Sequence, residues 1–153
     1  MELLRAAMHA PTARNTQSWR FMVIRNRKAL DEMTTLQPYT GMMKTAPCAI
    51  LVMGDRTVTD LDEYLYCDCS AAIENILIEA RHQGLSTCWC AVGPRRERID
   101  NFRRYYGLKE DLLPVAVVAV GYGCEEKEIS LEYISDSYID HCVCTGFSPI
   151  PDI

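Results

Sequence analysis

The stretch LDEYLYCDCSAAIENILIEARHQG, residues 61–84, decides the fold. Its apolar residues recur every three or four positions, the spacing that places side chains on one face of an α-helix. That face consists of Leu65, Cys69, Ala72, Ile73, Ile76, Leu77 and Ala80. Thr59 or Asp60 can cap the first free amides, and Gly84 ends the helix. The predicted helix, 61–83, exceeds the usual length of about 10–14 residues, so we expect it to be the spine of the domain.

Shorter patterns on both sides of this helix predict further strands and helices. Strands are expected at 19–24, 49–53, 86–92 and 115–121, and helices at 3–8, 28–36 and 95–106. The run VAVVAVG at 115–121 is apolar and rich in β-branched residues, so it predicts a central strand that is covered on both faces. The strand at 49–53 is expected to end at Gly54. These elements together predict a three-layer domain of sheet and helices.

The whole chain, residues 1–153, has the length of a single compact domain. Its last part, 123–153, has weak periodicity and several turn signals. We expect this segment to be a C-terminal arm that docks on the partner subunit, because it lacks the pattern needed to fold alone.

The composition excludes several classes of partner. A net charge of −5 argues against nucleic acid, because phosphate binding needs a basic face. No apolar run approaches the roughly 20 residues that cross a bilayer, so no membrane partner is expected. The first residues have no signal-peptide layout, since Glu2, Arg5 and His9 interrupt the apolar positions. We therefore expect a cytoplasmic protein.

Eight cysteines are many for a chain of this length, and six of them form C-x-C pairs: Cys67/Cys69, Cys88/Cys90 and Cys142/Cys144. Residues i and i+2 of a strand face the same side, so the second pair could supply half of a metal site. No C-x2-C pair or histidine at metal-ligand spacing completes it. We favour the interpretation that these cysteines are small apolar residues of a reduced protein, and a metal or redox module is the alternative.

Two motifs occur in order along the chain. The first is LLRAAMHAPTARNTQSWRF, residues 3–21, and the second begins with DCSAAIENILIEARHQGLSTCWC, residues 68–90, and continues to the strand that ends at Gly121. The first resembles the nitroreductase-family segment L-x-A-A-x-x-A-P-[ST]-x-x-N-x-Q-P-W-x-F. The second resembles the family's long helix, its G-L-G-x-x-W turn and the following strand. Together the two motifs cover well over half of the chain.

The resemblance implies an α+β fold with a nitroreductase-like α-β-α arrangement, a mostly antiparallel central sheet and an interlocked homodimer. It also implies flavin mononucleotide (FMN) as the cofactor, held by both chains. One chain would contribute the loop residues Pro11, Thr12, Ala13, Arg14, Asn15 and Gln17. The other would contribute Cys90, Ala91 and Val92, with a backbone N–H near Ala91 directed at flavin N5.

The activity that the resemblance implies is ping-pong hydride transfer. NAD(P)H would reduce the flavin at N5, and an electron-poor acceptor such as a nitroarene, a quinone or a flavin would then take its place. No catalytic side chain is expected, because the redox chemistry belongs to the cofactor.

The sequence departs from the family pattern in three places. Ser18 stands where the family usually has proline. The arginine-rich segment that grips the FMN phosphate, expected ahead of the first motif, is missing, and the acidic tail offers only Lys127. Three explanations compete: the true start lies upstream, Arg5, Arg14 or Lys127 substitutes, or flavin binding is weak or lost and the fold is a dimeric binding or regulatory module. The arginines of 95–104 are interpreted as a solvated helix face rather than a phosphate patch.

Overall fold

The computed structural model describes residues 1–124 of the chain. Its strands form one sheet in the order β1-β2-β4-β3, and every neighbouring pair is antiparallel. The strands are β1 (Trp19–Ile24), β2 (Cys48–Asp55), β3 (Ser86–Ala91) and β4 (Leu112–Gly121). The α+β class and the antiparallel sheet are therefore confirmed, and β1 and β3 are the two edges of the sheet.

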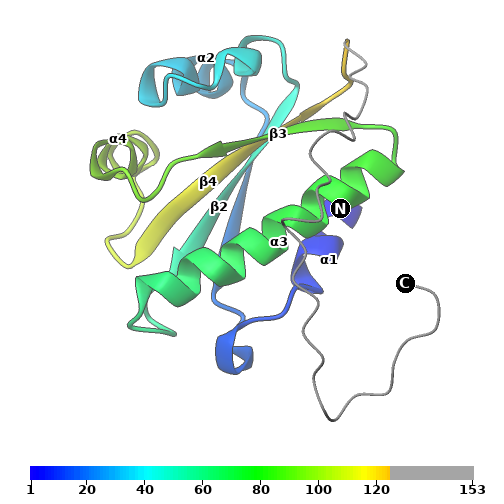
Figure 1. Cartoon of the computed structure of the whole chain (residues 1–153). Helices are drawn as coiled ribbons and strands as arrows, with labels where there is room; N and C mark the ends of the chain where they lie inside the picture. Colours follow the sequence, from blue (N-terminus) through cyan, green and yellow to red (C-terminus); the bar gives the residue numbers. More distant parts are fainter. Residues whose placement is uncertain (125–153) are drawn as a thin grey trace, which may run out of the picture.

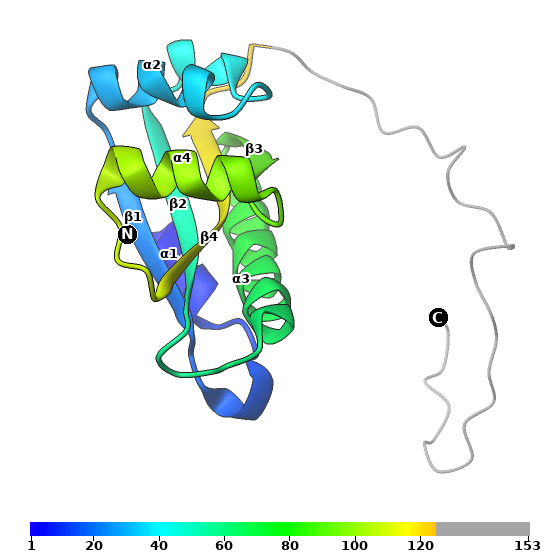
Figure 2. The same cartoon turned by 90° about the vertical axis from the view of Figure 1, so that its left-hand side faces the viewer.

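Helices cover both faces of this sheet, which confirms the three layers. Figures 1 and 2 show α1 and α3 on one face and α2 and α4 on the other. The helices are α1 (Glu2–Met8), α2 (Arg27–Leu36), α3 (Asp62–His82) and α4 (Arg96–Tyr106). Two short 3-10 turns, η1 (Ala13–Asn15) and η2 (Gly41–Lys44), were not expected from the periodicity. No helix within residues 1–124 is long and apolar enough to cross a membrane.

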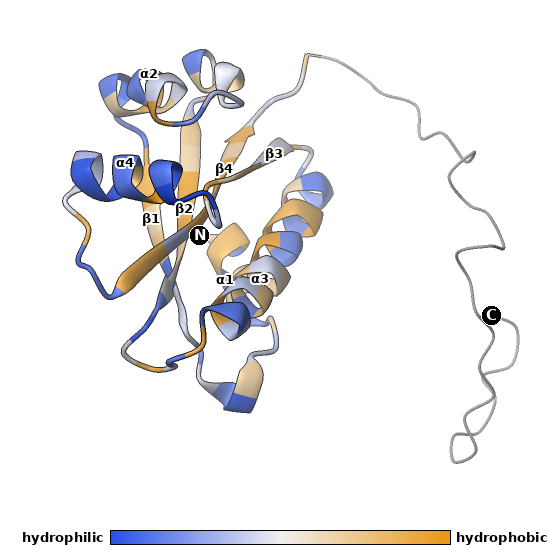
Figure 3. Ribbon diagram, turned by 60° about the vertical axis from the view of Figure 1, so that its left-hand side comes forward, coloured by the Kyte–Doolittle hydropathy of each residue, from blue (hydrophilic) through white to orange (hydrophobic). Residues whose placement is uncertain are grey.

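The two central strands carry most of the core. Every residue of β4 from Leu113 to Val120 is buried, and the hydropathy colouring in Figure 3 shows β2 and β4 as the apolar middle layer. The strand begins earlier than predicted, at Leu112, and it includes Pro114. A register shift between Val52 and Met53 explains this, because the bulge leaves Val115 without a direct partner on β2. A proline without an N–H is tolerated in a sheet at such an irregularity.

The prediction that β2 ends before Gly54 was wrong. Gly54 pairs with Trp19 of β1 and with Leu113 of β4 inside the sheet. A Cβ atom at this glycine would lie 2.7 Å from the Cβ of Leu65 on α3. The glycine is therefore required by the close approach of α3 to the sheet, and not by a turn.

The apolar stripe predicted for α3 is buried as expected, apart from the half-buried Leu77, but the N-terminal cap of the helix differs. The cap residue is Leu61, and its side chain makes no capping hydrogen bond. The Arg56 guanidinium instead binds the first residue, Asp62, through Nε and Nη2 at 2.8 and 2.7 Å. Asn75 joins α3 to α1, since its Nδ2 donates to the Ala6 carbonyl at 3.0 Å.

A Gly54→Ala variant tests whether the spacing between α3 and the sheet is as tight as the structure shows. We expect it to lower the free energy of unfolding by about 1–3 kcal/mol, since Leu65 must move to admit the methyl group. Gly41→Ala is the matched control, because no atom lies within 4 Å of the added Cβ atom. Urea unfolding of both variants measures the difference, and equal stabilities would contradict this packing.

Candidate functional site

The loop between α1 and β1 holds the first group of predicted site residues in a strained backbone. Arg14, Asn15 and Gln17 all have positive φ angles, of 54°, 55° and 49°. A left-handed residue other than glycine costs about 1–2 kcal/mol. Three such residues in a short loop need strong external support, and outliers of this kind cluster at functional sites.

Asp68 supplies most of that support from the second turn of α3. Its Oδ1 accepts the N–H of Ala13 at 2.9 Å, and its Oδ2 accepts the hydroxyl of Ser18 at 2.9 Å. Asp68 is only 4% exposed, so both bonds lie in a region of low dielectric. The serine that replaces the family's proline is therefore used directly: it fixes the end of the loop on the long helix.

Arg20 supports the other end of the loop. Its Nη1 donates to the Gln17 carbonyl at 3.1 Å, and its Nη2 forms a salt bridge of 2.7 Å with Asp55. The Asp55 carboxylate also accepts the hydroxyl and the N–H of Thr57. These hydrogen bonds, that of the Thr57 hydroxyl above all, together with the nearby Arg20, hold the pKa of Asp55 below its ordinary value of 3.8.

The loop presents polar groups to the outside. Pro11, Arg14, Asn15 and Gln17 are exposed, while Thr12 and Ala13 are half-buried. The Thr12 hydroxyl accepts the Gln17 N–H at 3.0 Å and still has its own hydrogen to donate. A cavity of about 640 Å³ opens beside Gln17, lined also by residues of α1 and β1.

The second group of predicted residues lies at the end of the edge strand β3. Val92 and Gly93 both donate their N–H groups to the Val115 carbonyl at 3.0 Å. Hydrogen-bonded and non-hydrogen-bonded pairs alternate in an antiparallel ladder, so Ala91, opposite Ala116, directs its N–H and C=O away from β4. Ala91 is exposed, whereas the side chains of Cys90 and Val92 are buried. Of these three predicted residues, Ala91 is the one with backbone groups at the open edge.

Side chains from two other elements fix the position of Ala91. The Nε2 of Gln37 and the Nη1 of Arg98 donate to its carbonyl at 3.1 and 3.2 Å. Gln37 is buried, and its Oε1 accepts the N–H of Tyr39. The guanidinium of Arg98 lies over the Tyr39 ring, 5.4 Å from its centroid. The carbonyl of Ala91 is thus occupied, and its N–H stays available on the same side of the strand.

The Cys88/Cys90 pair lies on one face of β3, as predicted, with 3.8 Å between the sulfur atoms. Burial raises the pKa of the Cys90 thiol to about 12, and the neighbouring Cys88 adds to the shift. Cys90 is therefore a neutral thiol near pH 7. Within residues 1–124, no group of three His, Cys, Asp or Glu side chains is placed to hold a metal ion. Cys142 and Cys144 lie outside the described residues.

The long helix separates the two groups of site residues within one chain. Asp68 contacts the loop, while the Tyr66 ring packs against Gly93, just beyond β3. Residues two positions apart in a helix, as Tyr66 and Asp68 are, point about 200° apart. The loop and the β3 end therefore lie on opposite sides of α3. The loop also leads into β1 and Ala91 ends β3, which are opposite edges of the sheet. One chain does not bring the two groups together.

Sequence reasoning assigned no role to Asp68, Arg20, Gln37 or Arg98 at this site. Asp68 could have been found, because it falls on the apolar stripe of α3, three residues after Leu65, where a carboxylate needs a buried partner. The other three residues give no sequence signal, since their hydrogen bonds to backbone carbonyls leave no mark on the pattern of apolar and polar residues.

The three cations proposed as substitutes for the phosphate clamp differ in their surroundings. Arg5 is paired with Glu2 of its own helix at 3.1 Å and is largely exposed. Arg14 is exposed on the loop, and no hydrogen bond or ion pair to it is found within residues 1–124. Lys127 lies outside the described residues. Arg14 is therefore the cation closest to the loop donors that remains available there.

Comparison with known proteins relates the chain to one family over most of its length. Residues 1–39 and 34–122 match the family model described as "Nitroreductase family". A Methanothermobacter thermautotrophicus protein named "Putative NADH dehydrogenase/NAD(P)H nitroreductase" is 36% identical over 124 residues, covering 81% of this chain and 65% of that protein. A protein of the same name from Archaeoglobus fulgidus is 38% identical over 128 residues, covering 83% and 74%. The chain thus spans less than two thirds of the length of the first relative.

Solved structures agree with this relation. The crystal structure of a protein with the same name from Parabacteroides distasonis superposes with a TM-score of 0.85 at 35% identity, covering 92% of this chain and 82% of that one. The structure of a nitroreductase in complex with FMN from Desulfovibrio desulfuricans gives a TM-score of 0.78 at 23% identity, covering 92% and 82%. At 23% identity, the similarity to the Desulfovibrio desulfuricans structure shows only a shared fold.

An Asp68→Asn variant tests the support of the loop. The amide oxygen of asparagine can accept only one of the two hydrogen bonds. Its NH2 group then faces another donor, either the Ala13 N–H or the Ser18 hydroxyl, and the negative charge is lost. We expect the free energy of unfolding to fall by about 1–3 kcal/mol. Denaturant unfolding measures it, with Asp60→Asn as an exposed acidic control. A variant as stable as the control would refute the role of Asp68.

The lowered pKa of Asp55 predicts a dependence of stability on pH. A carboxylate whose pKa is lower in the folded state stabilises the protein above its ordinary pKa, and this contribution is lost as the pH falls through the folded-state value. The free energy of unfolding should therefore fall below about pH 4. Asp55→Asn should lower stability at pH 7 and flatten part of this acid dependence. If the free energy of unfolding of the variant falls at acid pH as much as that of the unmodified protein, Asp55 is not the cause of the fall.

Proposed function

Because this chain belongs to the nitroreductase family, we propose that it is an FMN-dependent NAD(P)H oxidoreductase that works as a homodimer. The names of the 36% and 38% identical relatives support the oxidoreductase class and the use of NAD(P)H. The FMN complex of the Desulfovibrio desulfuricans protein, which shares the fold, supports the choice of flavin. The acceptor would be an electron-poor molecule such as a nitroarene, a quinone or a free flavin.

The observation that carries the proposal is the open-edge N–H of Ala91. Gln37 and Arg98 hold the Ala91 carbonyl, so the adjacent N–H is fixed in direction, and Ala91 is an exposed residue. A fixed backbone donor beside a flat ring can hydrogen-bond N5 and still leave the ring face open to a second molecule. An exposed N–H on an edge strand needs a partner of this kind or water.

The loop residues fit the remaining polar groups of FMN. Thr12 offers a hydroxyl donor, and Asn15 and Gln17 offer exposed side-chain amides, which suit ribityl and phosphate oxygens. Arg14 is the loop's cation and would balance part of the phosphate charge. Of the other site residues, Pro11 and Ala13 of the loop would contribute contact surface to the flavin, while Cys90 and Val92, whose side chains are buried, would hold Ala91 in place beside it.

Bound FMN would accept a hydride from NAD(P)H and deliver it to the acceptor. The chain's own contribution is then positioning rather than acid–base chemistry. Ala91 orients the ring edge, the loop holds the polar chain, and Asp68 and Arg20 keep the loop in its strained form before any ligand arrives. The neutral thiol of Cys90 takes no part as a nucleophile.

The separation of the two groups of residues supports the proposed homodimer. The loop and Ala91 lie on opposite sides of α3, so a flavin that contacts both needs the loop of one copy and the β3 end of another. In this proposal residues 123–153 form the C-terminal arm of the single domain and dock on the partner subunit. Residues 125–153 lie outside the described part of the chain.

The visible spectrum of the purified protein tests the proposal. Protein incubated with FMN and then desalted should absorb near about 450 nm, and this band should bleach on addition of NADH or NADPH without oxygen. Protein that stays colourless after incubation with excess FMN would overturn the flavoenzyme and favour a dimeric binding module on the same fold.

An Ala91→Pro variant tests the role of the backbone donor. Proline removes the N–H but breaks no bond to β4, since this N–H faces the open edge. We expect FMN affinity to fall about tenfold, the value of one hydrogen bond near 1.4 kcal/mol. Thr87→Pro is the matched control, because Thr87 also occupies a non-hydrogen-bonded position of β3. Equal FMN affinity in the two variants, measured by flavin fluorescence titration, would contradict the assignment.

A further inference from the structure

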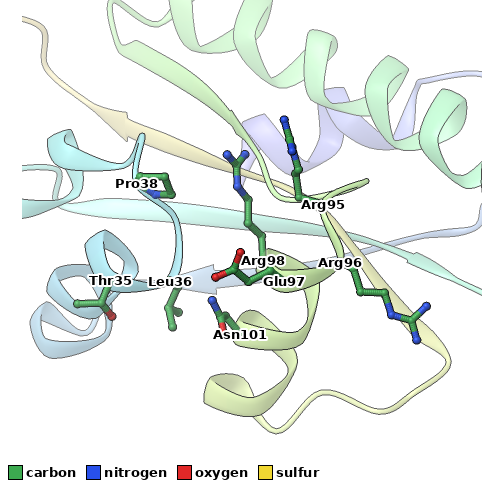
Figure 4. A pocket seen from close by; sticks show the side chains of 8 residues that line it. All are labelled: Thr35, Leu36, Pro38, Arg95, Arg96, Glu97, Arg98 and Asn101. Carbon is green, nitrogen blue, oxygen red and sulfur yellow. The ribbon is translucent and has the colours of Figure 1, made fainter.

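A basic cavity lies at the start of α4, next to the end of β3. Its volume is about 520 Å³, within the range of about 300–1,000 Å³ that is typical of small-molecule sites. The charged and polar side chains that line it are Arg95, Arg96, Glu97, Arg98, Asn101 and Thr35. Figure 4 shows these side chains, most of them from the first turns of α4 and the rest from the end of α2.

The cavity concentrates positive charge in a protein whose net charge is −5. Three guanidinium groups line it together with one carboxylate, that of Glu97. Elsewhere in residues 1–124 four arginines, Arg5, Arg20, Arg27 and Arg56, form salt bridges with carboxylates and five others form none, but those five do not line a cavity with two further arginines. The structure gives no salt bridge for the three arginines of the cavity within the same range. An arginine cluster that the protein's own acids leave uncompensated favours an anionic ligand.

Arg98 and Arg95 form the centre of this cluster. Arg95 is the N-cap of α4 and Arg98 lies in its first turn, and Figure 4 shows both side chains directed toward the same side, with Arg96 directed elsewhere. Arg98 is held in place by the Ala91 carbonyl at 3.2 Å and by the Tyr39 ring. Only one of its five N–H donors is used by that carbonyl, so the remaining donors can bind a ligand.

We infer that this cavity binds the phosphate monoester dianion of a nucleotide. Guanidinium groups match phosphate oxygens in charge and geometry, and a dianion gains more from several arginines than a diester does. The phosphate would lie beside Ala91, the residue that orients the flavin in the proposed function. The choice of nucleotide, NADPH or FMN, rests on that proposed function. The 2′-phosphate of NADPH is the source that agrees with the proposed function, in which Arg14 and the loop hold the 5′-phosphate of FMN. The 5′-phosphate of FMN is the competing source, and its binding here would replace that assignment of Arg14. The first source gives a preference for NADPH over NADH.

Binding measurements with and without each phosphate test the inference. Titration calorimetry compares NADP⁺ with NAD⁺ in one arm, and fluorescence titration compares FMN with riboflavin in the other. We expect the unmodified protein to prefer the phosphorylated member of one pair by at least about tenfold. Arg95→Gln/Arg96→Gln should abolish that preference and leave the affinity for the other member unchanged. Arg98 is not varied, because it also positions Ala91.

Arg104→Gln is the matched control, since Arg104 is exposed in the last turn of the same helix and does not line the cavity. Loss of the NADP⁺ preference in the double variant alone identifies the dinucleotide as the source, and loss of the FMN preference identifies the flavin. No preference in the unmodified protein, or the same preference in the double variant and the control, overturns the inference. A single Arg95→Gln variant with an unaltered thermal transition guards against misfolding. Failure of the proposed function is a separate result, seen as the absence of a flavin band in the unmodified protein.

Discussion

The site depends on the two hydrogen bonds that the buried carboxylate of Asp68 accepts. This carboxylate lies on the core face of α3 and accepts one hydrogen bond from the backbone of the loop and one from Ser18. A charge in that position is unfavourable unless it is hydrogen-bonded, and the left-handed residues of the loop are unfavourable unless they are held. Each of the two features satisfies the requirement of the other. The long helix therefore positions the loop as well as packing against the sheet.

The same helix explains the division of the site. Its stripe from Leu65 to Ala80 packs on the sheet, with Gly54 allowing the close approach. The loop is attached to one side of its N-terminal half, and the turn after β3 to the other, through Tyr66 and Gly93. A rigid element between the two groups prevents them from meeting in one chain. Because each group offers unfilled donors, assembly of two copies would complete one binding site, as the proposed function requires.

The edge position of β3 gives the second group its chemical character. Backbone groups in the middle of a sheet are consumed by the ladder, whereas an edge strand keeps alternate N–H groups free. At Ala91 the carbonyl is occupied by Gln37 and Arg98, so the free group there is a donor of fixed direction. Arg98 belongs to both this contact and the basic cavity, and it therefore connects the predicted flavin edge with the cluster of arginines on α4.

The amino-acid sequence by itself determined the long helix, the central strand and the three layers, because periodic burial and β-branched runs are local signals, and its resemblance to the family implied the antiparallel α+β class. It also determined membership of the family, through two ordered motifs, and it predicted that Cys88 and Cys90 share a face. Only the tertiary structure decided that Gly54 continues a strand, that Pro114 accompanies a bulge, and that Asp68 holds the loop. Each of these depends on a residue that is distant in sequence and close in space, and a periodic pattern carries no record of such a neighbour. The direction of the Ala91 N–H was undecided for the same reason, since the register with β4 sets it.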